Sequence, residues 1–129
     1  MLSTSLRRLA ALALLIASTF GQNITCIPSG TTGNCGAFTT KFCSSFDQRT
    51  IAVGDSISAC FATGVDNLKC DLTAVNTFPM AALPGISSCE TILSTVAADC
   101  PMGGSGQFPG GYTFVADPNS GVCQPPCGD

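Results

Sequence analysis

Histidine and tryptophan are absent from this chain of 129 residues, and charged residues make up only 10% of it. Without histidine the chain lacks the usual general base of serine and cysteine hydrolases and the commonest nitrogen ligand of zinc. Most zinc-dependent and general-base chemistry is therefore excluded, and the sequence predicts neither a metal site nor a cofactor.

Motifs that suggest catalysis have simpler explanations. Gly54-Asp55-Ser56 resembles the nucleophile segment of one lipase and esterase class, but no histidine is present to activate the serine, so a turn is favoured. Asp117-x-Asn119-x-Gly121 lacks the acid that closes an EF-hand calcium loop. The carboxylates available for glycoside hydrolysis lie mostly at predicted helix caps and turns: Asp55, Asp66, Asp71, Glu90, Asp99 and Asp117. The prediction is a binding protein and not an enzyme.

Long apolar runs are also missing, apart from one near the N-terminus. Arg7 and Arg8 precede an apolar segment over 9–17, and small or polar residues follow it. This pattern is typical of a secretory signal peptide, and the apolar segment is too short to span a bilayer. We expect residues 1–21 to be removed, leaving residues 22–129 as one secreted domain without membrane insertion.

Basic residues are scarce in the predicted mature chain. Once residues 1–21 are removed, three basic residues remain against eight acidic ones, a net charge of −5. A surface of this sign repels nucleic acids and anionic membranes. Neither is expected as a partner.

Nine cysteines follow the predicted signal peptide, and in an oxidising compartment cysteines form disulfides far more often than metal sites. Four bridges with one cysteine left over, or paired between two chains, are expected, and the connectivity stays open. The candidates are Cys26, Cys35, Cys43, Cys60, Cys70, Cys89, Cys100, Cys123 and Cys127.

Phenylalanines at four-residue spacing predict a first helix. Phe38, Phe42 and Phe46 fall on one face of a helix over 36–47, with Asn34 as one candidate cap. A phenylalanine stripe at this spacing is much more often core than ligand platform, so these rings are assigned to the core.

A second helix is predicted over 87–100. Ser87 and Glu90 have the spacing of a capping box, and Pro101 ends the helix. Apolar side chains recur behind the cap at intervals of three and four residues, at Cys89, Ile92, Leu93, Val96, Ala97 and Cys100.

The remaining pattern predicts an antiparallel sheet of about five strands. Its strands are expected at 50–53, 56–63, 68–77, 112–116 and 121–124, the first three as a meander, with a turn at 117–121 and an irregular arm over 26–35. Since each helix and each strand has one apolar side to bury, the predicted class is α+β, with a disulfide-linked sheet covered by helices. An open sheet edge favours pairing with a second copy.

The segment 103–111 contains five glycines and leads into Tyr112, the only tyrosine. It is interpreted as a flexible loop with an amphipathic ring at its rim. A sugar site needs an aromatic ring beside amides or carboxylates. The candidate ligand-binding residues are Gln107, Phe108, Tyr112, Asp117 and Asn119. The alternative, in which Phe108 and Tyr112 only pack the loop onto the sheet, stays open.

Asn23-Ile24-Thr25 is an acceptor sequon for N-glycosylation, or a chance match.

Several segments together resemble a family of small secreted mushroom lectins. They are Asn23 to Cys26, Gly54 to Gly64, Gly103 to Gln107 with Phe114, Asp117 to Gly121, and Cys127-Gly128. The resemblance implies a single α/β/α-sandwich domain that dimerises through its sheets and binds glycans without catalysis. It implies a GalNAc-containing ligand, with or without fucose, on a cell or virus surface.

Other classes fit part of the pattern. A hydrophobin-like coat protein would share the secretion and the cysteine number, but adjacent cysteine pairs are expected there and this chain has none. A killer-toxin-like or protease-inhibiting defence protein would share the disulfide-linked α/β build. A screen of the mature protein against many glycans separates these classes from a lectin.

Overall fold

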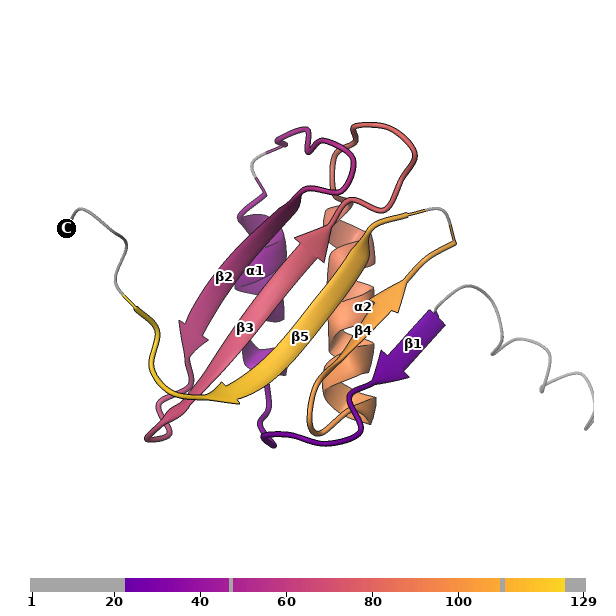
Figure 1. Ribbon diagram of the computed structural model, residues 1–129. Helices are drawn as coiled ribbons and strands as arrows, with labels where there is room; N and C mark the ends of the chain where they lie inside the picture. The colour runs from indigo at the N-terminus through magenta and orange to yellow at the C-terminus, as the bar shows by residue number, and fades with distance from the viewer. Residues whose placement is uncertain (1–22, 47, 110, 125–129) are drawn as a thin grey trace, which may run out of the picture.

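A computed structural model describes residues 23–46, 48–109 and 111–124; the predicted signal peptide over 1–21 lies outside them. The chain forms one five-stranded antiparallel sheet in the order β1-β4-β5-β3-β2, with two α-helices (Figure 1). The elements are β1 (Asn23–Cys26), the 3-10 helix η1 (Gly36–Phe38), α1 (Thr39–Ser44), β2 (Ser56–Ala62), β3 (Leu68–Val75), α2 (Ile86–Asp99), β4 (Gly104–Gln107) and β5 (Thr113–Ser120). The predicted α+β class and five-stranded antiparallel sheet are confirmed. No helix within the described part of the chain is long and apolar enough to cross a bilayer.

Both helices lie on the same face of the sheet, packed against each other (Figure 1). The alternation along β3 follows from this arrangement: Leu72 and Ala74 are fully buried beneath the helices, whereas Asp71 and Thr73 point the other way and are partly exposed. We call these the covered face and the open face. In the described residues the protomer therefore has two layers, helices and sheet, and no helix on the open face to make the third layer of a sandwich.

The second helix is confirmed, but its predicted cap is wrong. α2 begins at Ile86, with Gly85 at the N-cap and no side-chain hydrogen bond to the cap, so the capping box of Ser87 and Glu90 does not form. The helix ends at Asp99, two residues before Pro101. Its buried side chains are among those that the apolar spacing predicted: Cys89, Ile92, Leu93 and Val96.

The first helix is shorter than predicted and starts as a 3-10 turn. Cys35, and not Asn34, is the N-cap of η1, although Asn34 Oδ1 accepts a hydrogen bond from the Gly36 N–H at 2.9 Å. Phe42 and Phe46 are buried with their rings edge to face, centroids 5.2 Å apart. Phe38 is partly buried and stacks on Phe61 of β2. The assignment of this stripe to the core is confirmed.

Two strand predictions and one turn prediction are wrong. Residues 50–53 form only an isolated bridge between Ile51 and Ala82, so the sheet contains the β2–β3 hairpin but no three-stranded meander. Residues 117–120 continue β5 instead of turning, with Pro118 buried opposite Cys70. Residues 121–124 form no strand. One strand that was not predicted is β1, which pairs with β4. It lies at the start of the arm that was predicted to be irregular.

The glycine-rich segment is also more ordered than predicted, because it contains β4. A Cβ at Gly106 would lie 2.5 Å from Ile24 Cδ1 and 2.5 Å from Ile92 Cγ2, and one at Gly104 would lie 2.5 Å from the Thr25 carbonyl oxygen. These glycines therefore allow β1 and α2 to approach β4 closely, as glycine in a strand often does.

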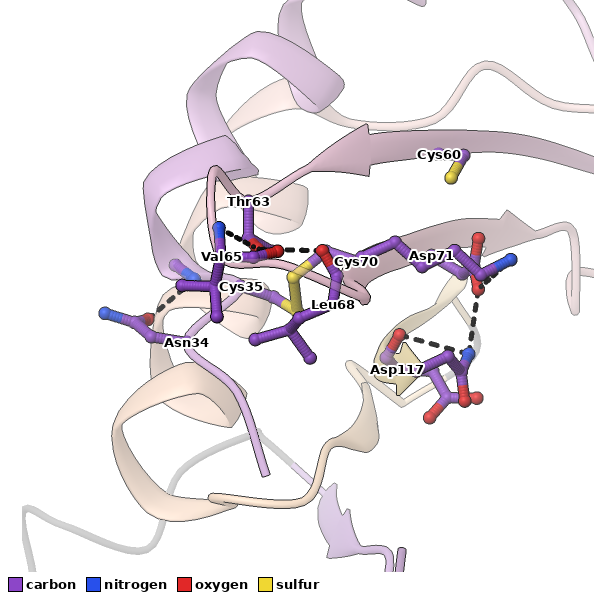
Figure 2. The surroundings of a disulfide bond; sticks show 12 residues. Asn34, Cys35, Cys60, Thr63, Val65, Leu68, Cys70, Asp71 and Asp117 are labelled. Atoms are coloured by element: carbon purple, nitrogen blue, oxygen red, sulfur yellow. Dashed lines mark hydrogen bonds and ion pairs between the residues drawn. A yellow bond between two sulfur atoms is a disulfide. The ribbon is translucent and has the colours of Figure 1, made fainter. Parts of the chain in front are cut away.

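Four disulfides form, as expected: Cys26–Cys100, Cys35–Cys70, Cys43–Cys89 and Cys60–Cys123. Cys127 lies outside the described residues. The strand register puts Cys26, Cys60 and Cys70 at the same end of the sheet, where β3 begins and β5 finishes. We call this the disulfide end. Figure 2 shows Cys35–Cys70 there, beside the hairpin turn in which Thr63 Oγ1 donates to the Leu68 carbonyl at 2.8 Å.

Candidate functional site

A pocket of about 270 Å³ opens at the opposite end of the sheet, next to the first turn of α2. We call this end the loop end, since residues 48–55 lead from α1 into β2 there, residues 76–85 connect β3 to α2, and residues 108–109 follow β4. The pocket is lined by four aromatic rings together with small and apolar residues: Phe78, Leu83, Gly85, Ser88, Phe108, Pro109, Gly111, Tyr112 and Phe114. Its volume is just below the range of about 300–1,000 Å³ typical of small-molecule sites, so it accommodates a single ring or a ring substituent.

Two other hollows are larger but lack aromatic walls. One, of about 520 Å³, runs along residues 50–56, and another, of about 350 Å³, lies between residues 62–68 and 121–122. Neither has an aromatic ring among its lining residues. The aromatic pocket at the loop end, which we call the end pocket, is therefore the better candidate for a ligand with an apolar face.

A polar cluster lies on the open face at the loop end, across the sheet from Tyr112 and Phe114 of the end pocket, and it meets the pocket at Gly111. Gln107 Nε2 donates to Thr77 Oγ1 at 3.3 Å, and the hydroxyls of Thr77 and Thr113 are 3.2 Å apart. The Thr77 hydroxyl also donates to the carbonyl oxygen of Gly111, a pocket residue. One amide and two hydroxyls thus adjoin the pocket at Gly111. Gln107 and Phe108, which are consecutive in the chain, both lie in this region.

Asn76 holds the loop end together, and its role was missed from the sequence. This side chain is 1% exposed; its Nδ2 donates to the carbonyls of Ile51 at 2.8 Å and Met80 at 3.0 Å. Its Oδ1 accepts from the Phe78 N–H at 2.9 Å. The alternation that buries Leu72 and Ala74 also places Asn76 inward, which is the signal that could have identified it.

Tyr112 is buried and not at an exposed rim, so that prediction is wrong. The residue is 3% exposed, and its hydroxyl donates to the Ala82 carbonyl at 2.7 Å. Its ring meets Phe78 edge to face and stacks on Phe114, both with centroids 6.0 Å away. Burial raises the pKa of the phenol above its ordinary value of 10.0. Tyr112 forms part of the pocket wall, because it continues the inward alternation of β5.

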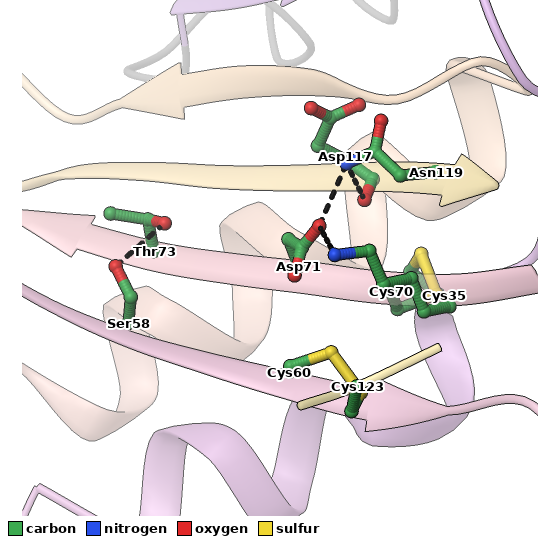
Figure 3. Close-up of polar contacts among 10 residues, drawn as sticks. Cys35, Ser58, Cys60, Cys70, Asp71, Thr73, Asp117, Asn119 and Cys123 are labelled. Atoms are coloured by element: carbon green, nitrogen blue, oxygen red, sulfur yellow. Dashed lines mark hydrogen bonds and ion pairs between the residues drawn. A yellow bond between two sulfur atoms is a disulfide. The ribbon is translucent and has the colours of Figure 1, made fainter. Parts of the chain in front are cut away.

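Asp117 and Asn119 do not join the other candidates. They lie on the open face toward the disulfide end, where Asn119 Nδ2 donates to Asp71 Oδ2 at 2.8 Å and Lys69 Nζ lies 3.4 Å from the same oxygen (Figure 3). Gln107 pairs with Thr113, four residues before Asp117, which corresponds to about 13 Å along the strand. The predicted set therefore splits into a loop-end group and a separate polar cluster.

Comparison with known proteins decides the family. The family model described as "Glycan binding domain Y3" matches residues 34–123. The chain is also 34% identical over 95 residues to "Antiviral protein CAP" of Coprinus comatus, a match that covers 69% of this chain and 90% of that protein. The chain belongs to the Y3 glycan-binding domain family. The resemblance to mushroom glycan-binding lectins is thereby confirmed.

The Y3 match includes the whole end pocket and the polar cluster beside it, because both lie within residues 34–123. It also includes three disulfides in full: Cys35–Cys70, Cys43–Cys89 and Cys60–Cys123. It leaves out β1 and with it Cys26. The candidate site thus belongs to the part of the chain that the family defines, and the β1 edge does not.

Proposed function

We propose that this protein is a secreted lectin that binds surface glycans at the end pocket without catalysing a reaction. The observation that carries the proposal is the juxtaposition of the aromatic pocket with the Gln107 amide and the Thr77 and Thr113 hydroxyls. Membership of a glycan-binding family supports it.

The chemistry of a sugar assigns different roles to the aromatic and the polar residues at the pocket. A pyranose has an apolar face of C–H groups, which packs against an aromatic ring, and hydroxyls that require donors and acceptors. Phe108 and Phe78 are partly buried and so retain some accessible surface for the apolar face. The Gln107 amide and the threonine hydroxyls then bind the hydroxyls of the sugar.

The proposed ligand class is a GalNAc-containing glycan, with or without fucose. The acetamido methyl is an apolar group small enough for a pocket of about 270 Å³ with aromatic walls, and the rest of the ring would remain at the polar rim. The relative named an antiviral protein supports a role in defence through glycans on cells or viruses.

A homodimer formed through sheet edges completes the proposal. One shallow sugar site binds weakly, but two sites on a rigid dimer raise avidity by roughly 100-fold or more when both reach glycans on one surface. β1 and β2 are the edge strands of the sheet, so either is available for pairing with a second copy.

Phe108→Ala, tested on a glycan array and by calorimetric titration, is the direct test of the site. Loss of the ring should weaken saccharide binding about tenfold, since an aromatic contact contributes roughly 1 kcal/mol beyond the area that it buries. Asp117→Asn, on the same sheet but in the other polar cluster, is the matched control and should bind as the wild type does.

The array also decides the class of protein. Selective binding of GalNAc-containing glycans supports the lectin. Silence of the folded wild-type protein across the array would contradict the proposed function and favour a toxin-like or inhibitor-type defence protein. Equal weakening by both substitutions would show that the end pocket is not the site. Circular dichroism of each variant establishes that the comparison is made between folded proteins.

A further inference from the structure

The Asn23-Ile24-Thr25 sequon lies in β1, at one edge of the sheet. Asn23 and Thr25 are exposed, and Ile24 between them points to the covered face, where it and Ile92 of α2 both lie over Gly106. Strand alternation therefore directs Asn23 and Thr25 to the open face. The acceptor asparagine is accessible from solvent at a fixed place on the fold.

The disulfides supply a second, independent observation. Four bridges are typical of a chain that matures in an oxidising compartment. In eukaryotes that compartment also contains the enzyme that glycosylates sequons of this type. One of the bridges, Cys26–Cys100, ties β1 itself to the end of α2, so the sequon is presented on an anchored strand.

The two edges of the sheet differ in what they offer a second chain. β1 has four residues and begins at the sequon, whereas β2 has seven residues and no acceptor asparagine. A glycan on Asn23 would occupy the space into which another strand must come to pair with β1. Natural sheets protect edges in comparable ways, with bulges, charges or covering segments.

We propose that Asn23 is an N-glycosylation site whose glycan closes the β1 edge, so that two copies pair through β2. The pairing through β2 rests on the homodimer proposed above. The glycosylation of Asn23 does not depend on it. Asn23 is also the cross-strand neighbour of Gln107, so the glycan begins one strand away from the polar cluster of the sugar site.

The modification is tested by secreting the full chain from a eukaryotic host. Intact mass before and after digestion with an N-glycosidase should show a glycan on the wild type and on Thr25→Ser, which keeps the sequon. Asn23→Gln and Thr25→Ala should show none. A wild-type protein whose mass does not change on digestion would overturn the proposal.

Pairing through β2 is tested by introducing a glycan on β2 itself. Ser56→Asn completes an acceptor sequon with Ile57 and Ser58 on β2, in the cross-strand row that runs through Val75, Thr113 and Gln107 to Asn23. Light scattering after size exclusion should give a dimer for the wild type and a monomer for the doubly glycosylated Ser56→Asn variant. Its dimer should return after digestion.

Removal of the natural glycan tests closure of β1. With both edges open, copies can pair β2 to β2 and β1 to β1 in alternation, so Asn23→Gln should form species larger than a dimer and Thr25→Ser should not. An unchanged Asn23→Gln dimer overturns the closing role, and a dimer of doubly glycosylated Ser56→Asn overturns pairing through β2. Monomers in every glycoform would overturn both the pairing through β2 and the proposed homodimer. The mass measurement would still show whether Asn23 is glycosylated.

Discussion

The two ends of the sheet are held by different means. At the disulfide end, covalent bonds link β1 to α2, the start of η1 to β3, and β2 to the chain after β5. At the loop end, one bridge, Cys43–Cys89, links α1 to the first turn of α2. The connecting segments there are held by hydrogen bonds from the side chains of Asn76 and Tyr112 and by the bridge between Ile51 and Ala82.

This difference separates stability from recognition. The disulfide end limits the freedom of the unfolded chain and so stabilises the fold as a whole. The loop end carries the aromatic pocket, and its few buried hydrogen bonds set the positions of Phe78 and the Tyr112 ring. Damage at the disulfide end should therefore lower stability without lowering sugar affinity, whereas damage at the loop end should lower sugar affinity.

Removing the Cys35–Cys70 bridge should have the largest effect on stability. The paired substitution Cys35→Ser/Cys70→Ser frees a loop with a sequence separation of 35 residues and should cost roughly 2–4 kcal/mol. In a domain of this size that corresponds to a fall in Tm of about 10 °C or more. Thermal unfolding followed by circular dichroism measures it.

The affinity of this variant for saccharide, measured well below its Tm, should stay near the wild-type value. A loss of affinity as large as that of Phe108→Ala would break the comparison, because it would show that the disulfide end shapes the pocket.

Asn76→Ala should have an intermediate effect on stability and a strong effect on binding. The substitution leaves the carbonyls of Ile51 and Met80 and the Phe78 N–H without their side-chain partner, at a cost of about 1–3 kcal/mol. Since Phe78 lines the pocket, saccharide affinity should fall as well. Denaturant unfolding and calorimetric titration measure the two quantities.

Asn76→Asp keeps an acceptor for the Phe78 N–H but places a buried carboxylate against the carbonyl oxygens of Ile51 and Met80, so it should be destabilised at least as much as Asn76→Ala. Full sugar affinity in Asn76→Ala would contradict the account of the loop end.

Tyr112→Phe should have the smallest effect. It removes the hydrogen bond to the Ala82 carbonyl, which also accepts from the Ile51 N–H, so the cost should be about 0.5–1.5 kcal/mol. The pH dependence gives a second readout. Below about pH 10 the phenol is neutral in both states and its contribution is complete.

Above about pH 10 the unfolded chain loses this proton while the buried phenol keeps it, so the free energy of unfolding falls as pH rises. Denaturant unfolding between pH 8 and pH 11 should show this fall in the wild type, and Tyr112→Phe should lack it. Parallel curves for the two proteins would mean that the ring is not buried.

The fold was predictable where side chains repeat with the period of one element. The spacing of Phe38, Phe42 and Phe46, and that of the apolar residues of α2, predicted both helices, and turn residues between alternating segments predicted the β2–β3 hairpin. Strand number was also predicted, although two of the five segments were wrong.

The errors came from contacts between distant segments. β1 is a strand because Ile24 packs over Gly106, and the 103–111 segment contains β4 because β1 and α2 close over its glycines. Nothing within either segment signals the other. For the site, Asp117 and Asn119 were grouped with Gln107 and Phe108 because β5 was expected to turn where it continues.

Two-dimensional amide NMR of the mature protein, titrated with an N-acetylgalactosamine-containing saccharide, tests the central claim most directly. The account predicts shift changes concentrated at the loop end, at Thr77, Phe78, Gln107, Phe108 and Gly111. The amides of Asp71, Asp117 and Asn119 should stay in place. Shift changes confined to Asp71, Asp117 and Asn119, or no shift changes at saturating saccharide, would contradict the placement of the sugar site at the loop end.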